Sequence, residues 1–227
     1  SVFLLMFTLA LAVSLGGPWL LRRHSLKRLF LFALGAEAVA LCLLALAGRA
    51  TNPGWGGLAL LGFALLAGPS MGALGISLNT AAIGLFPRAR GGALSALHAL
   101  LGAGATVWPL AIAAAAASGV WPTAPLALAA AFAAAWGVSV RVRLRGLPQR
   151  IRPEHARADL PAPLRRRAWA MLVYGAGEAV FTVWAVVLLF EVRRLPMTVA
   201  AGALSAFWLA MTGGRLAAVA AVRVIPE

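Results

Sequence analysis

The chain has 227 residues, of which 62% are hydrophobic and only 11% are charged, and its mean hydropathy is +0.90. So apolar a composition excludes a soluble globular domain and is typical of a polytopic membrane protein. The formal net charge of +14 lies in segments between apolar runs, so we interpret it as a determinant of membrane topology and not as a nucleic-acid-binding surface.

Seven apolar runs along the chain are long enough to cross a membrane. A helix needs about 20 apolar residues to span the hydrocarbon layer. The runs therefore predict an all-α, polytopic helical bundle. In chain order, the predicted spans cover residues 1–21, 29–47, 58–86, 92–117, 125–140, 168–190 and 197–222.

A basic segment, residues 141–167, separates the fifth predicted span from the sixth. It contains four prolines and nine of the 20 Lys and Arg residues, which is typical of a solvated loop. Lys and Arg near membrane helices favour the cytoplasmic side. Alternation of the spans then places the basic RRHSLKR and PRARG segments on the cytoplasmic side as well, and leaves only Arg49, Arg193 and Arg194 outside.

This topology predicts two helical bundles. Residues 1–140 form an N-terminal bundle, 141–167 a cytoplasmic linker, and 168–227 the start of a C-terminal bundle. Because the chain begins outside, within an apolar run, we expect that it is a fragment lacking one preceding helix. A Gly pair followed by basic residues occurs near the inner end of the first and last spans, which suggests duplicated halves.

Glu178 is the leading candidate for a functional group inside the membrane. A charge at mid-bilayer costs at least about 2.5 kcal/mol on insertion scales, so it needs a reason to be there. Tyr174 lies one helical turn earlier and could hydrogen-bond to it. We interpret Glu178 as a proton-binding group; a neutral carboxyl that holds the helices together is the alternative. Trp184 is either a cavity aromatic or a packing residue.

Four further polar or charged side chains lie in predicted spans. Glu37 lies about 12 Å into its span at about 1.5 Å per residue, and for it a role in bundle assembly is favoured over gating. Asn79 and His98 lie at a similar depth on consecutive spans and could contact a substrate or each other. Arg215 either extends toward the cytoplasm or binds helix ends at a gate.

A set of residues in the segment 72–109 and in the two last spans forms a specific pattern. They are Asn79, Phe86, Pro87, Leu94, Leu97, His98, Gly102, Gly104, Ala105 and Pro109, followed by the YGAGEAVFTVW and SAFWLAMTGGRL segments. The chain as a whole resembles the major facilitator superfamily, a fold of two six-helix bundles, and these segments resemble its fucose-permease-like branch. The visible helices would be its second to eighth, so the first and the last four would be missing. The chain departs from the family pattern at Leu21, where an Asp is usual, and at Gly75, where relatives often have an acid.

The resemblance implies a secondary active transporter that moves a small, sugar-like solute by alternating access in symport with protons. Glu178 would couple the protons, and Asn79, His98, Tyr174 and Trp184 would line the substrate cavity. Drug or metabolite efflux by the same fold is the alternative; a non-transporting receptor or scaffold is a third possibility. We expect a monomer in the bacterial inner membrane.

No motif for ATP hydrolysis, metal binding or catalysis occurs in the sequence, so we expect no cofactor, no metal and no enzymatic activity. The only lysine, Lys27, lies in a loop, which excludes a retinal Schiff base within the spans. The expected partners are the lipid bilayer, a small-molecule solute and protons, with no nucleic acid.

Overall fold

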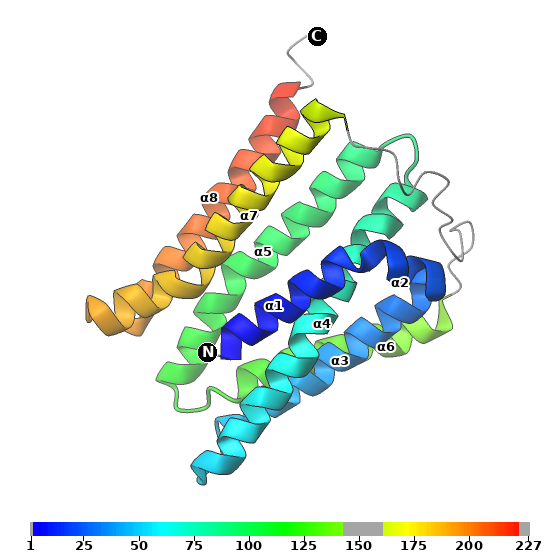
Figure 1. Cartoon of the computed structure of the whole chain (residues 1–227). Coiled ribbons are helices and arrows are strands. Elements are labelled where there is room, and N and C mark those ends of the chain that lie inside the picture. The colour runs from blue at the N-terminus through cyan, green and yellow to red at the C-terminus, as the bar shows by residue number, and fades with distance from the viewer. Residues whose placement is uncertain (1, 143–160, 223–227) are drawn as a thin grey trace. The chain divides into compact units, whose positions relative to one another are not determined.

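The computed structural model describes residues 2–142 and 161–222, and every regular element in these ranges is a helix (Figure 1). Six helices are long and apolar enough to span a membrane, or seven if a bent pair at the start counts as one span. The predicted polytopic helical bundle is thereby confirmed at this level. The elements are α1 (Val2–Leu15), α2 (Gly17–Arg23), α3 (Leu26–Ala47), α4 (Pro53–Leu85), α5 (Arg90–Ala117), α6 (Thr123–Arg141), α7 (Ala162–Val187), a π-helical turn η1 (Leu188–Val192) and α8 (Met197–Val222).

The chain divides into two compact units. Unit 1 contains α1 to α4, the first turns of α5, and α6; unit 2 contains the middle of α5, His98–Ala114, together with α7, η1 and α8. Most of the predicted linker, residues 143–160, lies outside the described residues. Its last part is helical and not a loop, because α7 begins at Ala162 with prolines at its start, where the missing proline N–H costs nothing.

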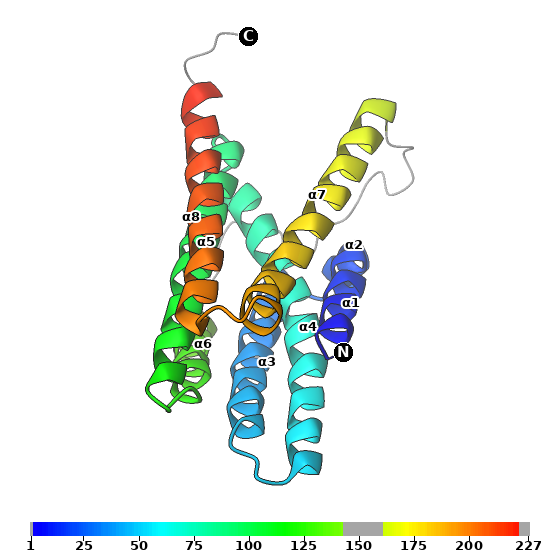
Figure 2. The ribbon, with the colours of Figure 1, turned by 90° about the vertical axis from the view of Figure 1, so that its left-hand side faces the viewer.

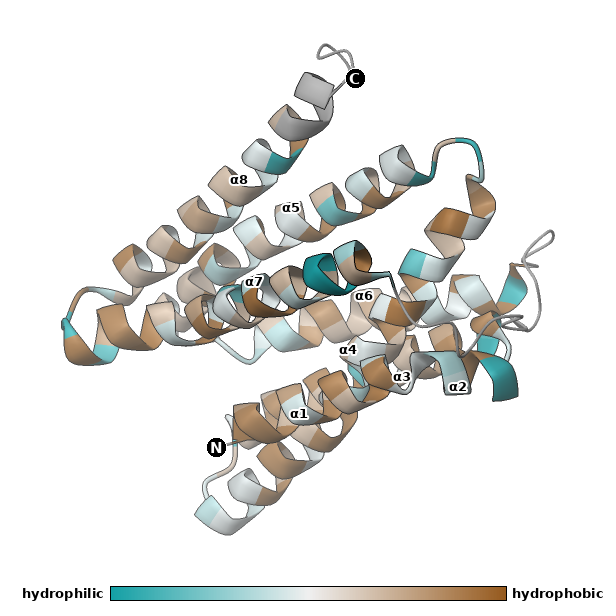
Figure 3. Ribbon diagram, turned by 45° about the horizontal axis from the view of Figure 1, so that its top comes forward, coloured by the Kyte–Doolittle hydropathy of each residue, from teal (hydrophilic) through white to brown (hydrophobic). Residues whose placement is uncertain are grey.

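The first predicted span is bent and not straight. Helices α1 and α2 meet at an angle of 61°. Pro18 causes the break, because it has no N–H to donate to the Ser14 carbonyl and its ring crowds that carbonyl. Gly17 then packs against the Ile76 side chain, so α2 rests on α4. Figure 3 shows polar residues gathered at the end of α2, while the spans are mainly apolar.

Unit 1 is held together by close helix packing. Helix α3 lies between α4 and α6, and α1 packs on α4 (Figure 2). A Cβ at Gly68 would lie 2.5 Å from the Met6 carbonyl oxygen, and one at Gly72 would lie 2.7 Å from the Ala10 carbonyl oxygen. Small residues thus allow the two backbones to approach, as is usual between membrane helices. Gly75, which belongs to the same small-residue stripe in the sequence, faces open space.

The loops of unit 1 gather at two opposite ends. Lys27, predicted to lie in a loop, is instead in the first turn of α3, which Ser25 caps, and it donates from Nζ to the carbonyl oxygens of Val140 (2.8 Å) and Val142 (2.7 Å) at the end of α6. At the other end, Gly48 lies directly against the Trp121 ring. The start of α3 and the end of α6, which the sequence assigns to one side of the membrane, therefore meet at one end of unit 1. The α3–α4 and α5–α6 connections, assigned to the other side, meet at the opposite end. Which end faces the cytoplasm stays a prediction.

Candidate functional site

An ion pair joins α7 to α8 in unit 2. Nη2 of Arg215 lies 3.3 Å from Oε2 of Glu178, and the two side chains are 31% and 19% exposed, respectively. Glu178 lies in the middle of the continuous helix formed by α7 and η1, about 24 Å from Ala162 and about 21 Å from Val192 at about 1.5 Å per residue. Glu178 therefore lies far from both ends of its helix, whereas Arg215 lies seven residues before the end of α8.

Two more side chains complete the cluster around this ion pair. Arg215 Nη2 also donates to Oη of Tyr174 at 3.1 Å, and the Tyr174 hydroxyl donates to Sδ of Met211 at 2.9 Å. Tyr174 and Glu178 are four residues apart on α7, and Met211 and Arg215 are four apart on α8, so each pair shares a helix face. We call these four residues the Arg215 cluster.

The Arg215 cluster revises two sequence-based interpretations. By its spacing Tyr174 could hydrogen-bond to Glu178, but in the structure Arg215 lies between them and donates to both, while the tyrosine proton is directed to Met211. Arg215 was expected to extend to the cytoplasm or to cap helix ends at a gate, and it instead pairs with Glu178 across the helix interface.

A signal for this pairing was present in the sequence. Tyr174 and Arg215 lie equally far along the chain from the connection at 193–196, which links α7 to α8. In an antiparallel helix pair such residues come to the same level. The turn itself forms through η1 and through Arg194, which adopts a left-handed conformation with φ of 57°. The predicted spans already placed this connection at 191–196, so the common level of the two residues could be obtained from the sequence, whereas the helix rotation that brings their side chains together could not.

Buried hydroxyls occur on the same helices. The hydroxyl oxygens of Thr182, Ser205 and Thr212 are buried and have no hydrogen-bond partner among the described residues. Buried polar groups in proteins are almost always hydrogen-bonded. Thr212 also lies against Gly102 of α5, where α5 and α8 approach closely within unit 2. None of these three hydroxyls was selected from the sequence, since Ser and Thr are common in membrane helices.

Glu37, the other carboxylate in the interior of a span, has a different environment in unit 1. Ser70 of α4 donates its hydroxyl to Oε2 of Glu37, and is also within hydrogen-bond distance, 3.0 Å, of the Ala67 carbonyl oxygen. Ser70 is fully buried, as are Ala33 and Ala40 of α3. The partner is neutral and the surroundings are tightly packed, which agrees with a role in bundle assembly.

In the part of the chain that the structure describes, the remaining predicted site residues make no hydrogen bond or ion pair with the Arg215 cluster. Asn79 donates from Nδ2 to the carbonyl oxygen of Gly75 on its own helix at 2.7 Å. His98 is exposed on α5 and belongs to unit 2, whereas Asn79 belongs to unit 1, so their pairing stays a prediction. Trp184 is 55% exposed on α7, and the ring packing between α7 and α8 comes instead from Phe181 and Phe207, whose centroids are 4.2 Å apart.

Within the ranges that the structure describes, no three His, Cys, Asp or Glu side chains come together as a metal site requires. The single cysteine, Cys42, is exposed and carries a free thiol.

Comparisons with known proteins return no match: no family model, no curated protein and no solved structure matches this chain. The helices themselves define the class: this is an integral membrane protein built from several apolar helices.

Proposed function

We propose that the protein is a secondary active transporter of the major facilitator type, which moves a small, sugar-like solute by alternating access in symport with protons. The observation that carries this proposal is the ion pair between Glu178, in the middle of one apolar helix, and Arg215, in the last third of the next. Charged residues inside membrane spans are costly and mark ion or substrate pathways in most proteins that contain them.

The geometry supplies a coupling mechanism. A proton on Glu178 removes its negative charge and so weakens its attraction to Arg215, which keeps its bonds to Tyr174 and Met211. The helix pair then has two electrostatic states, ion-paired and protonated, which is the kind of local switch that can bias a conformational change. In this scheme, alternate exposure of Glu178 to the two sides of the membrane carries the proton.

The polar surroundings favour a polar solute. The hydroxyls of Thr182, Ser205 and Thr212 are buried without a partner among the described residues, and only a conformation that exposes them would offer them to a solute rich in hydroxyl groups. Exposed aromatic side chains on α7, Tyr174 and Trp184, supply surfaces on which a sugar ring can stack. In the alternative, an efflux antiporter of the same fold, the same residues would couple proton entry to export of the solute.

The remaining parts of the proposal concern placement in the cell. The basic segment 141–167 lies on the cytoplasmic side, and the protein resides as a monomer in the bacterial inner membrane. Support comes from the positive-inside bias and from unit 1, in which Lys27 holds the first basic loop beside the end of α6. Labelling of a cysteine introduced at Arg150, in a variant whose exposed Cys42 is replaced by Ser, from each side of the membrane tests the orientation.

Proton coupling is tested with the purified protein in liposomes that enclose a pH-sensitive dye. A panel of neutral hexoses and pentoses is added outside, and inward proton movement together with sugar uptake is the expected result. Glu178→Gln should abolish accumulation driven by a pH gradient while it retains exchange of sugar across the membrane. Glu37→Gln is the matched control, and it should leave the coupled uptake close to wild type.

The outcomes separate the alternatives. Unchanged pH dependence of accumulation in Glu178→Gln contradicts the coupling role. Proton movement opposite to that of the solute indicates an antiporter. Solute binding, seen as a change in tryptophan fluorescence, without any flux indicates a receptor and overturns the transporter proposal.

A further inference from the structure

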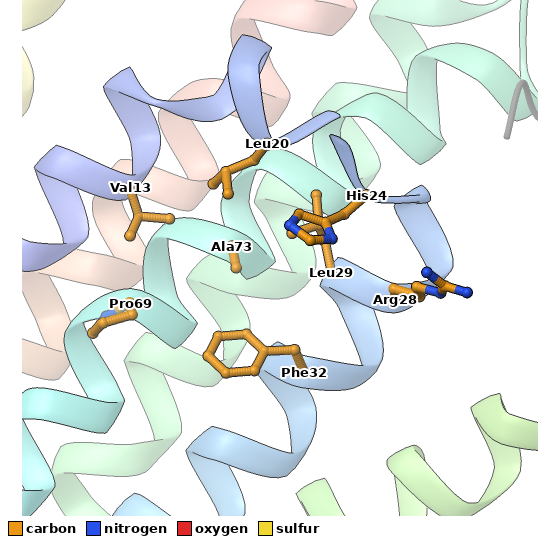
Figure 4. A pocket seen from close by; sticks show the side chains of 8 residues that line it. All are labelled: Val13, Leu20, His24, Arg28, Leu29, Phe32, Pro69 and Ala73. Atoms are coloured by element: carbon orange, nitrogen blue, oxygen red, sulfur yellow. The ribbon is translucent and has the colours of Figure 1, made fainter. Parts of the chain in front are cut away.

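A partly enclosed cavity of about 450 Å³ lies among α1, α2, α3 and α4 of unit 1. Its walls are apolar and include Val13, Leu20, Phe32 and Pro69, while His24 and Arg28 line its basic end. Figure 4 shows these two basic side chains at one end of the group, with Val13 and Pro69 at the other. The volume falls within the range of about 300–1,000 Å³ that is usual for pockets of small ligands.

The bend between α1 and α2 gives the cavity its shape. Because α2 departs by 61° from the direction of α1, Val13 and Leu20 line the cavity from two differently directed helices. Gly17 is buried against Ile76, which keeps α2 on α4. A straight helix through residues 1–21 would not enclose this space in the same way.

The basic end lies in a segment with the features of a membrane interface. Residues 22–28 contain four Lys and Arg residues together with His24. Trp19 is exposed one turn before Arg23, whose guanidinium lies 4.6 Å from the centre of the Trp19 ring. Tryptophan and basic residues concentrate at the level of the lipid headgroups.

Two of the four Lys and Arg residues in this segment already have partners. Lys27 donates to two carbonyl oxygens at the end of α6, and Arg23 lies over Trp19. Among the residues that the structure describes, the salt bridges join Arg215 to Glu178 and Arg194 to Glu191, so no described carboxylate neutralises Arg28 or His24.

An apolar cavity with a cationic end, at the end of membrane helices, is complementary to an anionic amphiphile. We propose that unit 1 binds an anionic phospholipid in this cavity, with one acyl chain against Val13, Phe32 and Pro69 and the phosphate on Arg28 and His24. Basic pockets between membrane helices bind anionic headgroups in this way. The apolar walls disfavour a free polar solute, which would lose its hydration without gaining hydrogen bonds.

Lipid binding is measured by native mass spectrometry and by thermal unfolding of the purified protein in detergent. The probes are palmitoyl-oleoyl phosphatidylglycerol, the phosphatidylcholine with the same chains, and inorganic phosphate. We expect phosphatidylglycerol to be retained several-fold more than phosphatidylcholine and to raise the melting temperature, whereas phosphate alone should have no effect.

Variants locate the site. Arg28→Gln should weaken phosphatidylglycerol binding about fivefold, and the pair Arg28→Gln with His24→Gln should weaken it further. Arg22→Gln in the same segment is the matched control and should bind as wild type. Ala73→Leu fills the cavity from α4 and should reduce binding of both lipids, because Ala73 lines the cavity and is buried.

Three results would each overturn the proposal. They are equal retention of the two lipids by the wild-type protein, unchanged phosphatidylglycerol binding in the Arg28 and His24 double variant, and stabilisation by inorganic phosphate equal to that by the phospholipid. If Ala73→Leu does not fold, the charge variants still decide the result, since they alter exposed side chains.

Discussion

The two carboxylates in the interiors of the spans, Glu37 in unit 1 and Glu178 in unit 2, have the same chemistry and different surroundings. Glu37 accepts a hydrogen bond from the neutral hydroxyl of Ser70, beside small residues that are fully buried. Glu178 pairs with the cation Arg215, and both side chains remain partly exposed. The helices around the two carboxylates also pack differently. Helix α3 packs closely on both α4 and α6, whereas α7 and α8 pack more loosely.

This difference separates an acid that joins helices from an acid that can change state. A carboxyl held by a buried hydroxyl among close-packed helices cannot move without breaking the packing. A carboxylate opposite an arginine in a loosely packed pair can gain a proton and release its partner with less disruption. The environment, and not the residue type, therefore assigns the two roles, and the following predictions test that distinction from the largest expected effect to the smallest.

The largest effect is expected where unit 1 is packed most closely. Gly68→Val should lower the free energy of unfolding by about 3 kcal/mol, because the new side chain would collide with the Met6 carbonyl and with Leu9 of α1. Titration with sodium dodecyl sulfate, followed by circular dichroism, measures the change.

Two matched controls use the same substitution where there is space. Gly75→Val on α4 and Gly177→Val on α7 place a Cβ with nothing within 4 Å. Each should change the free energy of unfolding by less than about 1 kcal/mol. A loss at Gly177 as large as that at Gly68 would show that unit 2 is as closely packed as unit 1, and the comparison would fail.

A smaller effect is expected at the ion pair of unit 2. Arg215→Gln should destabilise the protein by about 2 kcal/mol, because Glu178 would be left without its cation. The double variant Glu178→Gln with Arg215→Gln should recover most of this loss, since no unpaired charge remains. A double-mutant cycle on the unfolding free energies measures the coupling.

The exposed pair of Arg194 and Glu191 is the internal reference for this cycle. Its side chains are 82% and 58% exposed and its charged atoms are 4.0 Å apart. The same cycle there should give a coupling within about 0.5 kcal/mol of zero. Equal couplings at the two pairs would mean that the Arg215 cluster has no special electrostatic environment.

The smallest effect is expected at the hydroxyl of unit 1. Ser70→Ala should lower the free energy of unfolding by about 1 kcal/mol, because Glu37 loses its interhelical hydrogen-bond donor. Ser77→Ala is the control on the same helix, since Ser77 is also buried but donates only to the Ala73 carbonyl within α4. Ser77→Ala should leave the free energy of unfolding nearly unchanged in the same detergent titration. If the two variants are equally stable, Ser70 does not join α3 to α4.

Much of the fold could be predicted because hydrophobic run length is a local property. The predicted spans at 29–47, 58–86 and 92–117 fall within α3, α4 and α5, except that residue 86 lies one position beyond the end of α4. They agree because apolar segments in a membrane must form helices to satisfy their backbone hydrogen bonds. The bend at Gly16 was missed, although Pro18 signalled it, because hydropathy alone does not register a broken helix. The start of α7 was missed because Arg165, Arg166 and Arg167 resemble a loop by composition.

The site was only partly predictable. Glu178, Tyr174 and Arg215 could be selected one by one, because a charged or polar residue in an apolar run is conspicuous in the sequence. Their grouping around Arg215, the addition of Met211, and the pairing of Ser70 with Glu37 could not be obtained, since each depends on how one helix is rotated against another.

By itself, the sequence determined that this chain crosses a membrane several times as helices, and it identified which side chains are too polar for that setting. The tertiary structure alone decided which partner each of them has, the hydroxyl of Ser70 for Glu37 and the guanidinium of Arg215 for Glu178. The physical reason is that transfer into lipid depends on each segment separately, whereas a hydrogen bond or ion pair between helices depends on two segments meeting within about 3 Å at a particular rotation.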